Sequence, residues 1–192
     1  MSAKIVGWAH TKFGKSEAED VEALIAEVAG AALIHAEVVA QDVDGIFVGV
    51  LNNGFSKQGM EGALVALNAP ELAHTPAVHL ENACATGTAA LYAAIDFIAA
   101  GRGKIALVIG AEKMTAKPVA ETSDILLSAS YRKEEGDIPG GFAGVFGQIA
   151  QSYFQRYGDK SYELGLISAK NHANGVHNPY AQMRKDLGFD FC

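Results

Sequence analysis

The chain has 192 residues, a formal net charge of −7 and a hydrophobic content of 49% with 21 glycines. It is long enough to bury a substantial core, and its glycine content is typical of an α/β protein with many tight turns. The negative charge and the lack of a lysine or arginine block argue against nucleic acid and anionic membranes as main partners. Because the sequence has neither 18 consecutive apolar residues nor a signal-peptide pattern, we predict no membrane span and a cytoplasmic location, with an organelle matrix as the alternative.

Strands and helices are predicted to alternate through the first part of the chain. Short apolar runs predict strands at 4–8, 46–50, 78–80 and 105–110. Helical spacing of apolar residues predicts helices after Asp20, which is a suitable N-cap, at about 59–67, and after Cys84. This alternation implies parallel crossovers and a doubly wound sheet, in which ligands gather beyond the carboxyl ends of the strands.

Cys84 follows one of these strands and precedes an alanine-rich helix. The amino end of a helix carries unpaired N–H groups and about half a positive charge, which favours a thiolate and could hold a developing oxyanion. The small residues around it, from Ala83 to Thr88, leave room for a substrate. A free cysteine often just fills space in a core. The position of Cys84 at the carboxyl end of a strand nevertheless favours a nucleophile.

The composition changes after Gly110. Residues 116–141 contain two prolines and a mixed-charge run, and we expect them to form a solvated loop. The segment GGFAGVFG, at 140–147, is expected to be a flexible apolar stretch. Two further helices are predicted at 149–157 and 164–172, with no later strand.

No metal site is predicted from the histidines or the cysteines. His172 and His177 are five residues apart and lack the spacing and the neighbouring ligands of a metal site, so we interpret them as residues that order a loop. The two cysteines, one of which is the last residue, provide neither a disulfide framework nor a zinc site.

Several stretches of the sequence resemble the thiolase family, in particular the sterol-carrier-protein-linked type. They are ENACATGTAAL around Cys84, ALVIGAEKM at 106–114, and VFGQIAQSYFQRYG with KNHANGVHNPYAQ between 145 and 182. The resemblance implies an α/β fold with a thiolase-like doubly wound mixed sheet, helices on both faces and an inserted loop domain, truncated here. Residues 1–115 would form an N-terminal half-domain with Cys84 at a helix N-terminus, and residues 116–192 an incomplete loop domain.

The same resemblance implies an activity. Cys84 would attack the keto carbon of a 3-ketoacyl-CoA, acetyl-CoA would leave, and the acyl group would pass from sulfur to coenzyme A; condensation is the reverse. Coenzyme A and acyl-CoA are then substrates, and no tightly bound cofactor is expected. Phe146 and Gly147 are expected near the pantetheine arm, although a place for Phe146 in the core of the loop domain is an equal alternative.

The family implied by this resemblance carries its other catalytic groups in a second half that this sequence does not contain. We therefore expect the chain alone to be inactive or weakly active. It is expected to form a homo-oligomer (a dimer or a tetramer) or to bind a complementary C-terminal half. Two alternatives stay open: a related condensing enzyme of the synthase type, and a non-catalytic acyl-CoA-binding or assembly subunit. The related aldolases are disfavoured because their chemistry does not need the thiol.

Overall fold

The structure is a computed structural model that describes residues 3–192. The chain forms two compact units. The first consists of Glu17–Pro118 and the segment up to Thr11, and the second consists of Lys12–Ser16 and Val119–Cys192.

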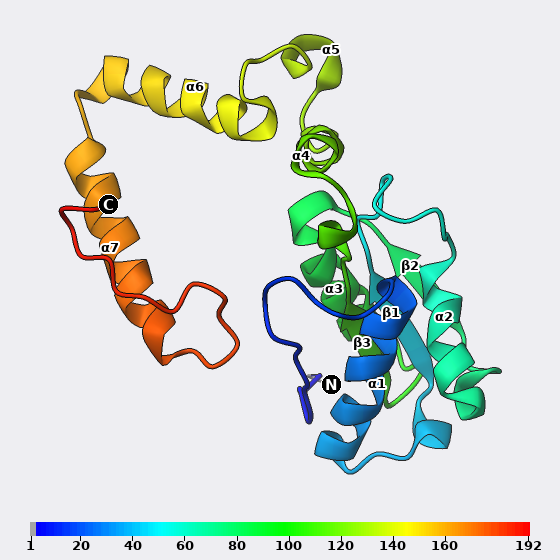
Figure 1. Cartoon of the computed structure of the whole chain (residues 1–192). Helices are drawn as coiled ribbons and strands as arrows, with labels where there is room; N and C mark the ends of the chain where they lie inside the picture. Colours follow the sequence, from blue (N-terminus) through cyan, green and yellow to red (C-terminus); the bar gives the residue numbers. More distant parts are fainter. Residues whose placement is uncertain (1–2) are drawn as a thin grey trace. The chain divides into compact units, whose positions relative to one another are not determined.

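A three-stranded parallel sheet forms the centre of the first unit (Figure 1). Its strands are β1 (Gly45–Gly49), β2 (Ala77–Leu80) and β3 (Ala106–Gly110), in the order β2-β1-β3. Ile46 of β1 pairs with Ala77 on one side and with Leu107 on the other. The three strands predicted after the first helix are therefore confirmed, and they are parallel, as the alternation with helices indicated.

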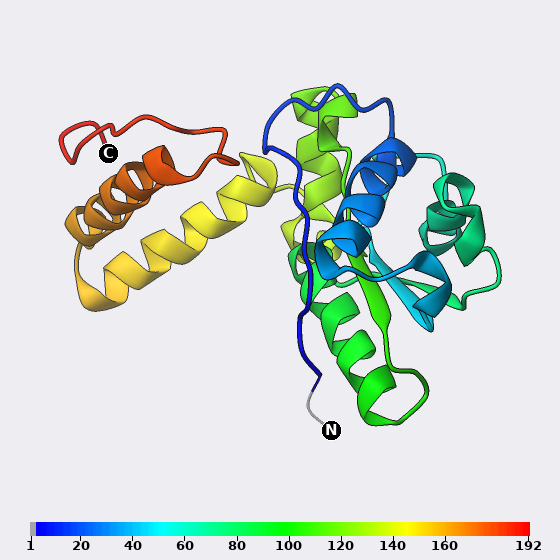
Figure 2. The same cartoon turned by 90° about the horizontal axis from the view of Figure 1, so that it is seen from below.

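Helices cover both faces of this sheet (Figure 2). They are α1 (Val21–Ala36) and α2 (Glu61–Asn68) on one face and α3 (Thr86–Ala99) on the other. Successive side chains of β1 point to opposite faces. Ile46 and Val48 therefore join the core beneath α1 and α2, whereas Phe47 packs with residues of α3. The predicted α/β class with helices on both faces is confirmed.

Side-chain oxygens fix two loop ends of the first unit. Asp20 caps α1 by accepting a hydrogen bond from the Ala23 N–H at 2.9 Å, as the sequence predicts. Asp44 accepts hydrogen bonds from the N–H groups of Lys104 and Ile105 at 2.7 and 3.1 Å. These bonds lower the pKa of the Asp44 carboxyl, and the bond from Lys104 has the largest effect. They also tie the start of β3 to the residue before β1.

The strand predicted at 4–8 is wrong. This segment runs in an irregular conformation beside α1 and does not join the sheet. The Trp8 N–H donates to Nδ1 of His35 at 3.3 Å, and the two rings meet edge to face. A Cβ on Gly7 would lie 2.6 Å from that of Ala36, so the segment packs directly on the helix. It therefore lacks the ladder of hydrogen bonds that a strand needs.

Four helices make up most of the second unit. They are α4 (Val119–Leu127), α5 (Arg132–Glu135), α6 (Gly141–Tyr157) and α7 (Ser161–His177). The helices predicted at 149–157 and 164–172 are confirmed, and both are longer than predicted. No helix within residues 3–192 combines the length and the apolar character that crossing a membrane requires.

The solvated loop predicted at 116–141 is wrong, because this region contains α4 and α5. The Arg132 guanidinium joins the two helices through an ion pair of 2.9 Å with Asp124. The hydroxyls of Ser128 and Ser130 donate to the carbonyls of Ile125 and Leu127, which satisfies the end of α4 locally. Pro118 thus directly precedes α4, and the mixed-charge run itself forms α5.

The flexible stretch predicted at 140–147 is also wrong, since it opens α6. Gly140 has a φ of 86°, a left-handed conformation that favours glycine. A Cβ on Gly144 would lie 2.0 Å from the carbonyl oxygen of Pro139. These glycines allow a tight turn into the helix and a close backbone approach.

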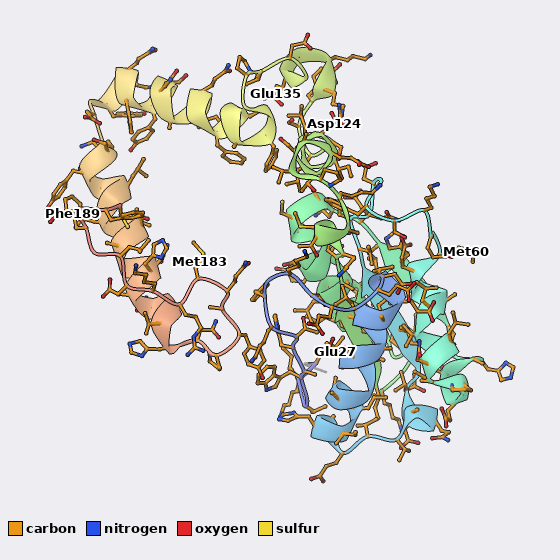
Figure 3. The ribbon with its side chains drawn as sticks, viewed as in Figure 1. Glu27, Met60, Asp124, Glu135, Met183 and Phe189 are labelled. Atoms are coloured by element: carbon orange, nitrogen blue, oxygen red, sulfur yellow. The ribbon has the colours of Figure 1, made fainter. Side chains whose placement is uncertain are left out.

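The C-terminal tail folds back on α7, where Phe189 contacts Tyr162 with ring centroids 5.1 Å apart (Figure 3). His172 and His177 lie in α7, so their interpretation as loop residues is wrong. Short 3₁₀ turns complete the chain: Ala40–Asp42, Pro70–Leu72, Ala83–Ala85 and Met114–Ala116.

We predict that Gly49→Ala destabilises the first unit by about 1–3 kcal/mol. A Cβ on Gly49 would lie 2.8 Å from Cγ2 of Thr86 and 3.0 Å from its carbonyl oxygen, and the neighbours at the end of β1 are packed backbone. Gly30→Ala is the matched control, because nothing lies within 4 Å of a Cβ at this position in α1. Urea unfolding should show a lower midpoint for Gly49→Ala and an equal or higher one for Gly30→Ala; equal midpoints for all three proteins would contradict the close approach.

Candidate functional site

Cys84 lies in the turn between β2 and α3. The chain leaves β2 at Leu80, passes through the 3₁₀ turn Ala83–Ala85 and enters α3 at Thr86. The Cys84 side chain is exposed and forms no disulfide. The structure thus places the sequence-predicted cysteine at the amino end of a 14-residue helix, accessible to a ligand. Its role as a nucleophile stays a prediction.

Thr86 holds this turn together from within. Its side chain is buried, and its hydroxyl donates to the Ala83 carbonyl at 2.6 Å. The same oxygen accepts a hydrogen bond from the Asn82 N–H at 2.8 Å. The hydroxyl therefore bonds to the backbone on the amino-terminal side of Cys84, while the Thr86 methyl group packs against Gly49.

Ala83, directly before the cysteine, adopts a left-handed backbone conformation with φ of 46°. A non-glycine residue in this region costs of order 1–3 kcal/mol and persists only where the surroundings enforce it. Here the Ala83 N–H donates to the Glu81 carboxylate and its carbonyl accepts from Thr86. Strain of this kind is common at functional sites, because it presents a side chain that a relaxed turn would not.

The backbone around Cys84 leaves hydrogen-bonding capacity free. Within residues 3–192, neither the thiol nor the backbone N–H of Cys84 has a hydrogen-bond partner. An N–H group at the amino end of a helix is suited to a carbonyl oxygen that gains negative charge. The turn can therefore offer a thiol and a donor to the same substrate carbonyl.

A polar cluster lies at the same edge of the sheet, on the face covered by α2. Glu61, the first residue of α2, is 1% exposed. Its Oε1 accepts a hydrogen bond from Nδ2 of Asn52 at 2.8 Å, and its Oε2 lies 3.3 Å from Nδ1 of His79. The other nitrogen of His79, Nε2, donates to the Val50 carbonyl at 2.8 Å. The cluster joins the ends of β1 and β2 to the start of α2.

Glu112, just after β3, extends this cluster to the third strand. One carboxylate oxygen accepts hydrogen bonds from the N–H groups of Leu51 and Asn52 at 2.8 and 3.2 Å. Burial raises the pKa of the Glu112 carboxyl, and the nearby charge of Glu61 adds to the shift, whereas the two backbone hydrogen bonds and His79 oppose it. Desolvation is the largest of these effects.

Sequence reasoning missed Thr86 and the polar cluster. A signal for Thr86 was present, because threonine near the first turn of a helix commonly bonds to the preceding backbone. His79 was a weaker signal, as the one polar residue in a short apolar strand. Glu61 and Glu112 read as ordinary polar positions, and only the fold brings them together.

Phe146 and Gly147 lie in α6 of the second unit, and Cys84 lies in the first unit. The Phe146 side chain is 57% exposed and meets Phe142 edge to face, with ring centroids 5.2 Å apart. Nothing lies within 4 Å of a Cβ at Gly147. Contact of these two residues with coenzyme A stays a prediction. Among residues 3–192, no three histidine, cysteine, aspartate or glutamate side chains are grouped as metal ligands.

The first unit is an α/β fold with a parallel sheet and an exposed cysteine at a strand-to-helix turn. The sequence matches the family model described as thiolase, N-terminal domain, over residues 3–187. The chain therefore belongs to the thiolase family, which the sequence motifs predicted.

Named relatives agree with this assignment. The chain is 34% identical over 179 residues to an acetyl-CoA acetyltransferase of Methanocaldococcus jannaschii, covering 93% of this chain and 45% of that protein. It is 28% identical over 200 residues to human sterol carrier protein 2, covering 97% of this chain and 35% of that protein. The chain thus spans less than half the length of these relatives.

Solved structures agree on the fold. The Ltp2-ChsH2(DUF35) aldolase matches with a TM-score of 0.70 at 21% identity, over 98% of this chain and 47% of the aldolase chain. An acetyl-CoA acetyltransferase from Syntrophomonas wolfei matches with a TM-score of 0.63 at 20% identity, over 90% of this chain and 46% of that chain. At these identities the matches support the fold alone.

We predict that Glu112 makes the stability of the first unit depend on pH. In the unfolded chain the carboxyl ionises near its ordinary pKa of 4.5, while the folded protein keeps the proton to higher pH. Stability should therefore fall as pH rises from below 4.5 and level off above the raised pKa. Glu112→Gln should remove this fall.

The measurement is the urea midpoint of wild type and Glu112→Gln at a series of pH values, with the exposed Glu71→Gln as the control. The difference in urea midpoint between wild type and Glu112→Gln should change between pH 4.5 and the raised pKa of Glu112. The midpoint of Glu71→Gln should follow that of wild type at every pH. A difference in urea midpoint that stays constant with pH would contradict the raised pKa of Glu112.

Proposed function

We propose that this chain supplies the nucleophilic cysteine of a thiolase-type acyl-CoA acyltransferase. The observation that carries the proposal is that Cys84 is exposed in a hydrogen-bonded turn at the amino end of α3. The chain that contains this turn belongs to the thiolase family. A relative at 34% identity is an acetyl-CoA acetyltransferase by name, which supports the same class of reaction.

The proposed reaction passes through an acyl-cysteine. The Cys84 thiolate attacks the keto carbon of a 3-ketoacyl-CoA, a carbon–sulfur bond forms, and the carbon–carbon bond breaks to release the enolate of acetyl-CoA, which takes up a proton. Coenzyme A then attacks the thioester, its thiol proton is removed, and the Cys84 thiolate is restored. Condensation is the reverse. The N–H of Cys84 is suited to hold the carbonyl oxygen as it becomes negative.

Coenzyme A and its thioesters are the proposed substrates, with no tightly bound cofactor. We assign residues 1–115 to the half-domain that carries the cysteine and residues 116–192 to a loop domain that contacts the pantetheine arm. The exposed face of α6 around Phe146, with Gly147 beside it, is the proposed contact. The cytoplasm is the proposed location.

The proposal also includes a protein partner, either a second copy of the chain in a dimer or tetramer, or a complementary C-terminal half. β2 lies at an edge of the sheet, and its Val78 side chain is 49% exposed. An uncovered edge strand with an exposed apolar side chain is suited to pair with another chain.

Two other functions compete with this proposal. A condensing enzyme of the synthase type would use the same turn and the same cysteine. A non-catalytic acyl-CoA-binding or assembly subunit would bind the thioester and leave the thiol free. The exposure of Cys84 and the strain at Ala83 favour a reacting thiol over the second of these.

We predict that incubation with acetyl-CoA adds one acetyl group to Cys84. Intact-mass measurement should show the adduct in wild type and in Cys192→Ala, the control for the other exposed cysteine, and no adduct in Cys84→Ala. Equal labelling of Cys84→Ala would overturn the assignment. Binding of acetyl-CoA without an adduct would support the non-catalytic subunit.

We also predict that the 192-residue chain by itself cleaves acetoacetyl-CoA poorly. Thiolysis needs groups that take and give protons, each of which contributes about 10²–10⁴-fold, and Cys84 has no such partner within residues 3–192. A spectrophotometric assay with coenzyme A should give little turnover. Rapid steady-state cleavage that is lost in Cys84→Ala would contradict this expectation.

A further inference from the structure

A buried carboxylate lies close to the cysteine turn and has no role in the chemistry proposed above. Glu61 is 1% exposed, and its Oε2 has no hydrogen-bond partner among residues 3–192. The His79 imidazole lies beside this oxygen, with Nδ1 at 3.3 Å, which is an ion-pair distance when the imidazole is protonated. A buried ion pair is often no more stable than apolar side chains of the same volume. Stability alone therefore does not explain a glutamate at this position.

His79 is oriented by its other nitrogen. The Val50 carbonyl can only accept a hydrogen bond. Nε2 of His79 therefore carries a hydrogen and donates a hydrogen bond of 2.8 Å to this carbonyl. Nδ1 consequently faces the Glu61 carboxylate. A protonated Nδ1 would turn an N–H toward the Glu61 carboxylate, whereas a neutral imidazole with its proton on Nε2 would turn a lone pair toward it. The His79 side chain is 32% exposed, so solvent can exchange this proton.

The pair fixes the end of β2, from which the cysteine turn departs. Both backbone polar groups of Val50 are hydrogen-bonded to β2. The Val50 carbonyl accepts from His79, and the Val50 N–H donates to the Leu80 carbonyl at 3.3 Å. Cys84 follows Leu80 by a few residues, and Thr86 fixes the far side of the turn against Gly49. The turn is therefore anchored on both faces of the sheet.

We propose that Glu61 and His79 are positioning residues for Cys84: the buried carboxylate and the imidazole hold the end of β2 so that the turn presents the thiol and its own N–H to one carbonyl. This inference rests on the proposed function. It assigns to α2, which begins at Glu61, a part in acyl transfer.

The charged groups that face His79 come from two of the elements around it. Glu61 belongs to α2, and Glu112 follows β3 and interacts with both Glu61 and His79. The neighbouring groups from the segment after β1 are the Val50 carbonyl and the Asn52 amide, which do not titrate.

The test compares two reactions of Cys84 in a Cys192→Ser background. Alkylation by iodoacetamide requires only an accessible thiolate, whereas acetylation by acetyl-CoA also requires the thiol and the N–H donor to be aligned. The ratio of the two rates, measured by intact mass, therefore reports alignment. Glu61→Ala and His79→Ala should lower this ratio by about tenfold or more. The exposed His74→Ala is the matched control and should leave the ratio unchanged.

Glu61→Gln separates positioning from general loss of structure. A glutamine amide can donate to a neutral His79 and its oxygen can accept from Asn52, so the geometry is kept without a titrating proton. This variant should retain the wild-type ratio at neutral pH.

Hydrogen exchange of the amides at 80–86 provides a second measurement. Exchange should be faster in Glu61→Ala than in wild type or Glu61→Gln, while exchange in α1 stays the same. An unchanged rate ratio and unchanged exchange at 80–86 in Glu61→Ala would overturn the inference. Absence of any acetylation in wild type would instead overturn the proposed function, and the exchange comparison would still decide whether the pair holds the turn.

Discussion

The close contact between Gly49 and Thr86 is the constraint on which the cysteine turn depends. α3 can begin at the carboxyl end of β1 only because Gly49 has no side chain. The Thr86 hydroxyl donates one hydrogen bond and accepts another, and these contribute about 0.5–1.5 kcal/mol each, which roughly offsets the cost of about 1–3 kcal/mol at Ala83. Local bonding alone therefore leaves the turn near balance, and the packing of α3 on the sheet decides its conformation.

The two faces of the sheet contribute to the site in different ways. On the α3 face the contact near Cys84 is a close approach of Gly49 to the methyl group and the backbone carbonyl of Thr86. On the α2 face the apolar core gives way at the carboxyl edge to a network of Asn52, Glu61, His79 and Glu112. Hydrogen bonds are directional, so this network restricts the conformation of the loop after β1 more than apolar packing would.

The sequence predicted the sheet well because buried parallel strands read as continuous apolar runs, as at 46–50 and 105–110. The run at 4–8 has the same pattern but packs on α1, because an apolar run does not specify its partner. Glycines at 140–147 indicated flexibility, whereas the close approach of Pro139 to Gly144 makes them part of a helix start.

The sequence predicted the cysteine of the candidate site but not the polar network beside it. Cys84 is marked by a local strand–turn–helix pattern that one short stretch of sequence contains. The polar network is assembled from residues far apart in the chain, and each of them alone reads as an ordinary surface residue. The parallel topology brings them together at the carboxyl edge, and periodicity along one segment carries no information about that neighbourhood.

The strand order β2-β1-β3 also has a consequence for how the chain folds. The first strand along the sequence is the central one, so one of its edges stays unpaired until β3 has been reached. Leu51 and Glu112, whose contact closes the carboxyl edge, are 61 residues apart in sequence. Closing so long a loop is entropically costly and slow, since non-local contacts form only after that cost is met. The cysteine turn, although its own residues are consecutive, is therefore packed on a sheet that only non-local contacts complete.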